Sequence, residues 1–228
     1  MHYDEFKQSD TELLRSLIRA FPFATIAING KDRPVVAHAP LTVRSLDDQQ
    51  TAIDFHLAKK NEITTLISGD QPATVIVSGP GAHISPSWYV ERFPSPASDR
   101  SRTAPTYNYV CATLYGRLQL LPSRDLRDQI AELVRHHEPS DGWKFHEIAP
   151  DILDVWCNAL NAFRMEIEHF EITAKVSQDR TPGDRGGVVE GLRRRAELQD
   201  EWMAELVKSY DGSPNSLTET LKRFTRRA

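Results

Sequence analysis

The sequence predicts a mainly β fold with peripheral helices (α+β), in which antiparallel strands in hairpin order form a partly closed barrel. Apolar and polar residues alternate with a period of two in several segments, which is typical of half-buried strands. The dipeptide Asn29–Gly30 joins two such segments and is a strong hairpin signal. Strands and helices do not alternate regularly around a glycine-rich first turn, so a parallel dinucleotide-binding fold is not expected.

The first half of the chain combines two short helices with several strands. Ser9-x-x-Glu12 resembles a capping box, and leucines at helical spacing follow it, which predicts a helix over residues 10–20. The segment from Gly79 to Pro105 is rich in proline and is expected to be a loop. Strands are predicted at 23–28, 35–38, 53–57 and 73–77, and a second helix at 59–68.

The second half begins with a long strand and ends in helices. The alternation in the strand 163–172 changes parity near His169, which predicts a β-bulge there. The tail after Gly212 is expected to be weakly ordered, so residues 1–192 are predicted to form the barrel domain and 193–228 a C-terminal helix and tail. The other elements expected here are a strand at 106–121 and helices at 123–134, 150–161 and 184–210.

Composition narrows the classes of function. The 228 residues carry a formal net charge of −4, and 39% of them are hydrophobic, which is enough for a buried core. Two cysteines and the absence of a long apolar run or a signal peptide predict a cytoplasmic protein without a membrane span. Direct nucleic-acid binding is not expected, because the basic clusters are interpreted as solvated helix faces: Arg193, Arg194, Arg195, Lys222, Arg223, Arg226 and Arg227.

Five histidines are considered as possible ligands of a metal or cofactor. His38, His56 and His83 each lie near the end of a predicted strand, and together they could reach a metal, a haem iron or a flavin. Alternatively, each ring is bonded separately to the backbone at the barrel rim. The adjacent His136 and His137 point about 100° apart on a helix, so they are interpreted as favourable charges at its C-terminal end.

An aromatic cluster precedes and begins the long strand. Tyr107 and Tyr109 should share one face of the strand, whereas Asn108 points to the other. Packing alone would explain the tyrosines. An inward asparagine beside an exposed Trp88 and Tyr89 is better suited to a planar ligand, which needs apolar faces and a few placed polar groups.

Four blocks of sequence resemble a known family. In order, they are HLAKKN at 56–61, GPGAHISPSWY at 79–89, PTYNY at 105–109 and KVSQDR at 175–180. Their order and spacing resemble the PaiB-type proteins, which are usually called FMN-binding negative transcriptional regulators and belong to the flavin split-barrel superfamily. The resemblance covers all but about the last 30 residues.

This resemblance implies a homodimeric split β-barrel with two cofactor sites at the subunit interface. The flavin phosphate would lie near His56, Ala58 and Asn61, with Lys59 or Lys60 adding charge, and His38 and Pro40 would lie along the ring system. The remaining residues that the resemblance assigns to the cofactor are His83, Trp88, Tyr89, Tyr107, Asn108, Lys175, Ser177, Gln178 and Arg180.

The family pattern also leaves alternatives open. His83 replaces a family aromatic residue, and Glu62 replaces a proline after the phosphate turn. Some PaiB-type proteins instead bind haem b and cyclise an N-hydroxylated ornithine to piperazic acid; here His56 would be the iron ligand, with His83 or His38 second. The chain is thus expected to be a flavin-dependent oxidoreductase or regulatory flavoprotein, a haem-dependent N–N bond-forming cyclase, or a cofactor-free transcriptional regulator.

Overall fold

The computed structural model describes residues 4–46, 50–67 and 69–225. In this part of the chain, eight strands form one antiparallel sheet in the order β3-β2-β6-β7-β8-β5-β4, and the short β1 pairs with β8. The strands are β1 (Lys7–Gln8), β2 (Phe23–Asn29), β3 (Pro34–Pro40), β4 (Thr42–Ser45), β5 (Thr51–Ala58), β6 (Gln71–Ile84), β7 (Thr106–Leu120) and β8 (Leu160–Lys175). The predicted fold class is confirmed.

The sheet curls because its two edge strands are neighbours in the chain. β3 and β4 stand at opposite ends of the strand order, yet only Leu41 separates them in sequence. β3 therefore also contacts β5, and the sheet forms a partly closed barrel. Its interior is filled by the apolar residues of each alternating pattern, including the cross-strand pair Phe55–Phe163, whose ring centroids are 5.6 Å apart.

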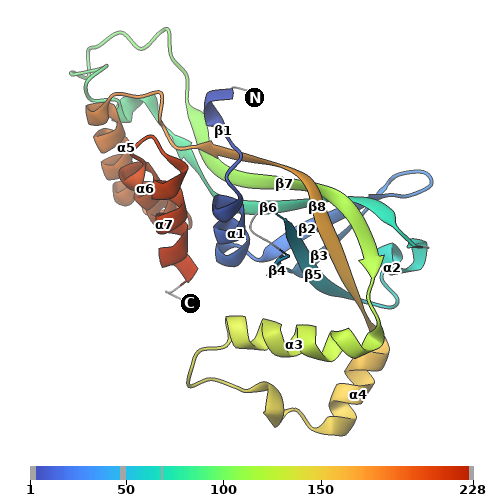
Figure 1. Ribbon diagram of the computed structural model, residues 1–228. Coiled ribbons are helices and arrows are strands. Elements are labelled where there is room, and N and C mark those ends of the chain that lie inside the picture. Colours follow the sequence, from blue (N-terminus) through green and yellow to red (C-terminus); the bar gives the residue numbers. More distant parts are fainter. Residues whose placement is uncertain (1–3, 47–49, 68, 226–228) are drawn as a thin grey trace.

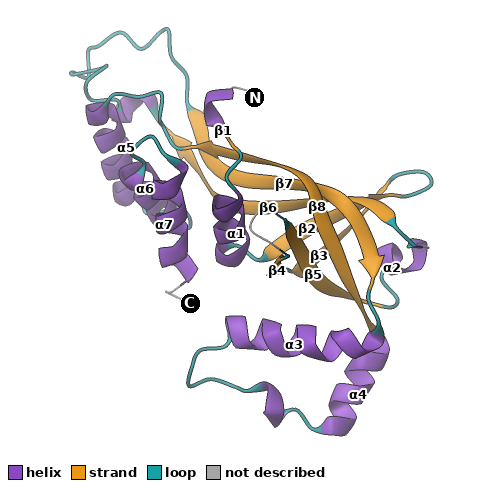
Figure 2. Ribbon diagram, in the orientation of Figure 1, coloured by secondary structure: helices purple, strands orange, loops and turns teal. Residues whose placement is uncertain are grey.

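Helices gather at both ends of the barrel (Figure 1). They are α1 (Thr11–Ala20), α2 (Glu62–Leu66), α3 (Ser123–His137), α4 (Pro150–Ala159), α5 (Pro182–Arg195), α6 (Asp200–Ser209) and α7 (Pro214–Thr225). Three single turns complete the described structure: η1 (Asp4–Phe6), η2 (Pro86–Trp88) and η3 (Phe145–Glu147). Figure 2 shows α5, α6 and α7 as one group, whereas α3 and α4 form an arm at the opposite end of the long strands. None of the described helices is long and apolar enough to cross a membrane.

The predicted bulge in β8 is confirmed. Tyr115 pairs with His169 and the next residue, Gly116, pairs with Ile167, so Glu168 is the extra residue. A side chain at Gly116 would overlap the carbonyl oxygen of Glu166, which explains why this position of β7 has none. The bulge lets one strand keep its apolar residues inward on both sides of the bend.

Three predictions about the elements were wrong. The helix expected over 184–210 is broken, because Ala196 adopts a left-handed conformation (φ 54°) and ends α5. The tail after Gly212 is not weakly ordered as far as Thr225: it forms α7, which buries Leu217 and Leu221 and contacts α1. Gly79–Ile84 is not a loop but the continuation of β6. Residues 226–228 of the tail, with Arg226 and Arg227, and Ser68 of the second predicted helix lie outside the described residues.

Candidate functional site

Except for His38 and Pro40 on β3, the predicted site residues fall into two groups at opposite ends of β8. His56 pairs with Ala162 near the beginning of this strand, whereas Tyr109 pairs with Lys175 at its last residue. These positions on β8 are thirteen residues apart, which corresponds to roughly 40 Å along an extended strand. We call the first group, with His56, Ala58, Lys59 and Asn61, the Leu160 end. The second group is the Lys175 end: His83, Trp88, Tyr89, Tyr107, Asn108, Lys175, Ser177, Gln178 and Arg180.

The Lys175 end is centred on Asn108, whose side chain points to the inside of the sheet and is only 1% exposed. Its Nδ2 donates to Ser177 Oγ over 2.8 Å, whereas its Oδ1 is buried without a hydrogen-bond partner in the described structure. Ser177 has a φ of 60°, which costs a non-glycine residue about 1 kcal/mol. An unsatisfied buried acceptor beside a strained serine is unusual in a folded protein and favours a ligand that supplies a donor.

Lys175 adds a positive charge beside this pair. Its Nζ donates to Thr106 Oγ1 over 2.6 Å and lies 5.5 Å from the centre of the Phe6 ring. Burial lowers the pKa of Lys175 below its ordinary value, because the charged ammonium is partly removed from water. The ammonium has three donors, of which the described hydrogen bond uses one.

In the turn after β8, two residues predicted to bind the cofactor instead form contacts within the protein. Gln178 accepts from the Val176 N–H and donates to the Ala174 carbonyl, both over 2.7 Å, so its amide holds the turn. The Arg180 guanidinium lies 4.7 Å from the centre of the Tyr89 ring and 3.2 Å from the Asp179 carboxylate. Arg180 is partly buried, and its positive charge helps to lower the pKa of Lys175.

The aromatic residues at this end differ in exposure. Tyr107 is 59% exposed and meets the His83 ring edge to face at 5.8 Å, so both rings lie at the surface of the strand pair. Tyr89, expected to be exposed, is 1% exposed because η2 turns it into the main core, and burial raises its pKa. Trp88 is partly buried against α5, where a side chain at Gly191 would overlap its ring.

Arg195 holds this end together, although the sequence pattern indicated only a solvated helix face. Its guanidinium forms two hydrogen bonds to Asp200, of 2.8 and 2.5 Å, and one of 3.0 Å to the His83 carbonyl. It also lies 5.2 Å from the Trp88 ring centre. The prediction of a solvated face is therefore wrong for Arg195. No local sequence signal reveals this role, because His83 and Trp88 lie more than a hundred residues earlier in the chain.

The Leu160 end is a tight turn from β5 into α2. The Asn61 N–H donates to the Ala58 carbonyl, and the Asn61 Oδ1 accepts from the Ile63 N–H over 3.0 Å, so Asn61 is the N-cap of α2. Its Nδ2 forms no hydrogen bond within the described residues. Ala58 and Lys59 are exposed, and the Lys59 N–H donates to the Ala159 carbonyl. Glu62 replaces the proline of the family pattern. Its carboxylate forms a salt bridge of 2.8 Å with the Arg33 guanidinium, which offsets its negative charge.

The three strand histidines do not converge within one chain. His56 is partly buried on β5, and burial lowers its pKa, so the imidazole is neutral at physiological pH. His38 lies exposed on β3, two residues before the partly buried Pro40, and its ring stacks on Phe23 with centroids 6.2 Å apart. His83 lies at the Lys175 end. Among the described residues, no group of three metal-ligating side chains comes together.

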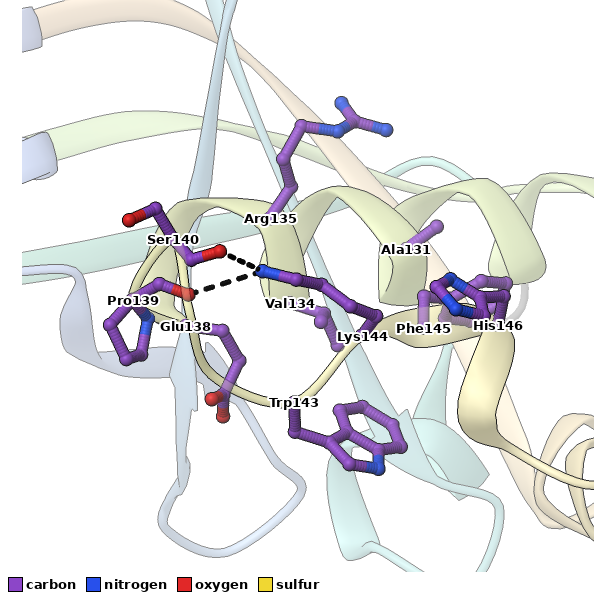
Figure 3. A pocket seen from close by; sticks show the side chains of 10 residues that line it. All are labelled: Ala131, Val134, Arg135, Glu138, Pro139, Ser140, Trp143, Lys144, Phe145 and His146. Carbon is purple, nitrogen blue, oxygen red and sulfur yellow. Dashed lines mark hydrogen bonds between the residues drawn. The ribbon is translucent and has the colours of Figure 1, made fainter.

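Two of the larger cavities of the described structure lie away from both ends. One, of about 430 Å³, lies between α3 and the segment that leads to η3 (Figure 3). Its Lys144 ammonium already donates to the carbonyls of Pro139 and Ser140, at 3.3 and 2.6 Å. The other, of about 540 Å³, lies where α1, β4, α3 and α7 meet. Neither is lined by a residue predicted to bind the cofactor.

Comparison with known proteins identifies the family. The family described as "Putative FMN-binding domain" matches residues 1–169, about three quarters of the chain. The chain belongs to this family. A relative from Bacillus subtilis, "Protease synthase and sporulation protein PAI 2", is 24% identical over 89% of the chain and 94% of its own length. The predicted relation to the PaiB-type proteins is thereby confirmed.

Solved structures of other proteins share the family's fold. The flavocytochrome Anf3 from Azotobacter vinelandii is 15% identical, with a TM-score of 0.57 over 76% of the chain and 71% of its own. A FAD and haem binding protein from Mycobacterium smegmatis is 16% identical, with a TM-score of 0.52 over 75% and 73%. At these identities the likeness shows the fold alone, and it confirms the flavin split-barrel architecture.

Proposed function

We propose that this protein binds FMN between two copies of the chain and acts as a redox-active or regulatory flavoprotein. Family membership supports a flavin, and the architecture is one on which planar cofactors are bound in the two solved structures named above. One observation carries the proposal of two copies. The groups that suit a flavin phosphate and those that suit its ring lie roughly 40 Å apart along β8, so no single chain can place both on one cofactor.

The free polar groups at the two ends complement different parts of FMN. At the Leu160 end, the Asn61 Nδ2 and the exposed Lys59 ammonium are donors, as an anion requires. At the Lys175 end, the unpartnered Asn108 Oδ1 is an acceptor for a ring N–H, and Tyr107 offers an exposed aromatic face. A second copy that places its Lys175 end against the first copy's Leu160 end completes the set. FMN would supply electron or hydride transfer at this site.

A haem-binding role is the second candidate, and His56 favours it. Because burial keeps the imidazole neutral, a ring nitrogen can ligate iron without first losing a proton. One solved neighbour is named a "FAD and Heme binding protein", and another is named a "Flavocytochrome". In this case His56 would be the metal ligand, and the protein would be a haem enzyme of the piperazate-forming kind.

The visible absorption spectrum of the purified full-length protein, before and after addition of FMN, separates the candidates. The two bands of bound flavin, saturating at one FMN per chain, support the proposal. A single intense Soret band that is lost in His56→Ala but kept in His38→Ala supports haem. A protein that shows neither spectrum and binds neither cofactor when they are added overturns both candidates and leaves the cofactor-free regulatory role.

A further inference from the structure

A cavity that none of the proposed cofactor-binding residues lines combines an aromatic wall with a basic rim. It occupies about 540 Å³ where the C-terminal ends of α1 and α3 meet β4, α6 and α7. This volume lies within the usual range for a small-molecule site. Because none of the residues proposed to hold FMN lines it, the inference does not depend on the proposed function.

The wall of the cavity is aromatic and prebuilt. Trp202 and Phe224 stack nearly parallel, with centroids 5.4 Å apart and planes at 18°, and both line the cavity. Phe21 packs against Trp202 at 5.1 Å and fixes the position of the indole. Trp202 is 40% exposed despite these contacts, so part of its ring faces open space. A fixed aromatic surface of this kind suits a planar ring.

The rim of the cavity is positive. Arg19, His136 and His137 all line it, and none of its described lining residues is acidic. Arg19 has only a weak partner, the exposed Glu12 carboxylate at 3.7 Å, and the nearby Glu132 is paired with Arg44.

The two imidazoles differ in what they offer a ligand. The Nδ1–H of His136 donates to the Glu132 carbonyl over 2.8 Å, so its Nε2 can donate to a ligand only when the ring carries a second proton. Burial and the neighbouring His136 lower the pKa of His137, so Arg19 carries the permanent charge and the His137 ring adds an N–H group.

We propose that this cavity binds a small aromatic carboxylate, with the ring against Trp202 and Phe224 and the carboxylate at Arg19 and His137. The class follows from the shape and charge of the lining: the aromatic wall selects a planar body, and the Arg19 guanidinium on a rim without acidic residues selects one anionic group. The sequence pattern indicates for His136 and His137 only a role as charges at a helix end. The structure adds that this helix end is brought to an apolar cavity.

Calorimetric titration of the full-length protein with naphthoate tests the proposal. Two matched ligands test the carboxylate contact and the ring contact separately. Naphthalenemethanol keeps the ring without the charge, and decahydronaphthoate keeps the charge without the planar ring. Both should bind at least about ten-fold more weakly than naphthoate. Arg19→Gln should weaken naphthoate binding by about ten-fold. Arg135→Gln makes the same change of charge on α3 outside this cavity and should leave the affinity within about two-fold.

Several results would overturn the proposal. Equal affinities for naphthoate and naphthalenemethanol would show that the rim does not recognise the anion. Equal losses of naphthoate affinity in Arg19→Gln and Arg135→Gln would show that Arg19 acts only through the net charge of the protein. An affinity that falls as the protein concentration rises would show that a second copy of the chain fills the cavity instead. No detectable binding up to the solubility limit of naphthoate would also reject it.

Discussion

The two ends of β8 are built in different ways. The Lys175 end is covered by α5 and α6, its rings and charges have partners within the chain, and Asn108 and Tyr89 are almost fully buried. The Leu160 end is an exposed turn before a five-residue helix, with Lys59 in solvent. The Lys175 half of the proposed site is therefore preorganised within a single chain. The other half consists of free donors, which need a second molecule before they enclose a ligand.

The largest expected effect tests the preorganised end through Arg195. Arg195→Ala leaves the Asp200 carboxylate, 2% exposed, without its charged partner, and should lower the free energy of unfolding by about 3 kcal/mol. Arg193→Ala on the same helix removes exposed pairs to Glu201 and Glu205 and should cost less than about 1 kcal/mol. Urea denaturation of both variants measures the difference. Similar losses would mean that the Lys175 end is not held by this buried pair.

Two adjacent glycines in α5 provide a second, smaller test of the same end. A Cβ at Gly187 would overlap the Trp88 carbonyl oxygen, whereas a Cβ at Gly186 meets nothing within 4 Å. Gly187→Ala should therefore lower the free energy of unfolding by about 1–3 kcal/mol. Gly186→Ala should raise it by about 0.5–1 kcal/mol, because alanine is the better helix former. Thermal unfolding of the two variants measures both changes in stability. A stabilising Gly187→Ala would refute the close packing of η2 on α5.

The smallest effect concerns His56 at the Leu160 end and depends on pH. Burial lowers its pKa in the folded chain, whereas in the unfolded chain it keeps the ordinary value of 6.5. Below pH 6.5 the unfolded state therefore binds more protons, and stability falls as the pH falls from neutral toward the folded-state pKa. His56→Gln should flatten this part of the profile. His137, whose pKa is lowered likewise, is present in both proteins, so the difference between their slopes reports His56 alone.

The sequence predicts most of the framework because local patterns determine it. Apolar and alternating runs placed six of the eight described strands, wholly or in part, Asn29–Gly30 placed the first hairpin, and the parity change placed the bulge beside His169. The closure of the barrel was harder to predict in detail. β4 and the extension of β6 lack a distinct alternation, and α7 is stabilised by contacts with α1 that no local pattern records.

The candidate site was less predictable, since strand register decides it. The resemblance brought the residues of both ends into one list, but only the pairing of β5 and β7 with β8 shows that they lie far apart in one chain. Likewise, the unpartnered Asn108 Oδ1 depends on Ser177, which is 69 residues away. The role of Arg195 depends in the same way on partners distant in sequence.

Complementation between two defective variants tests the shared site most directly. One variant carries Lys59→Ala with Asn61→Ser, which keeps the helix cap but removes the amide donor at the Leu160 end. The other carries Asn108→Ala with Lys175→Ala at the Lys175 end. Each alone should fail to bind FMN, with circular dichroism confirming that both are folded.

The decisive number is the FMN-binding capacity of an equal mixture, refolded together so that copies can exchange. If each cofactor lies between the Leu160 end of one copy and the Lys175 end of another, half of the pairs are mixed and each holds one intact site. The mixture then regains about a quarter of the wild-type capacity. A mixture that binds no more FMN than the separate variants would contradict the account.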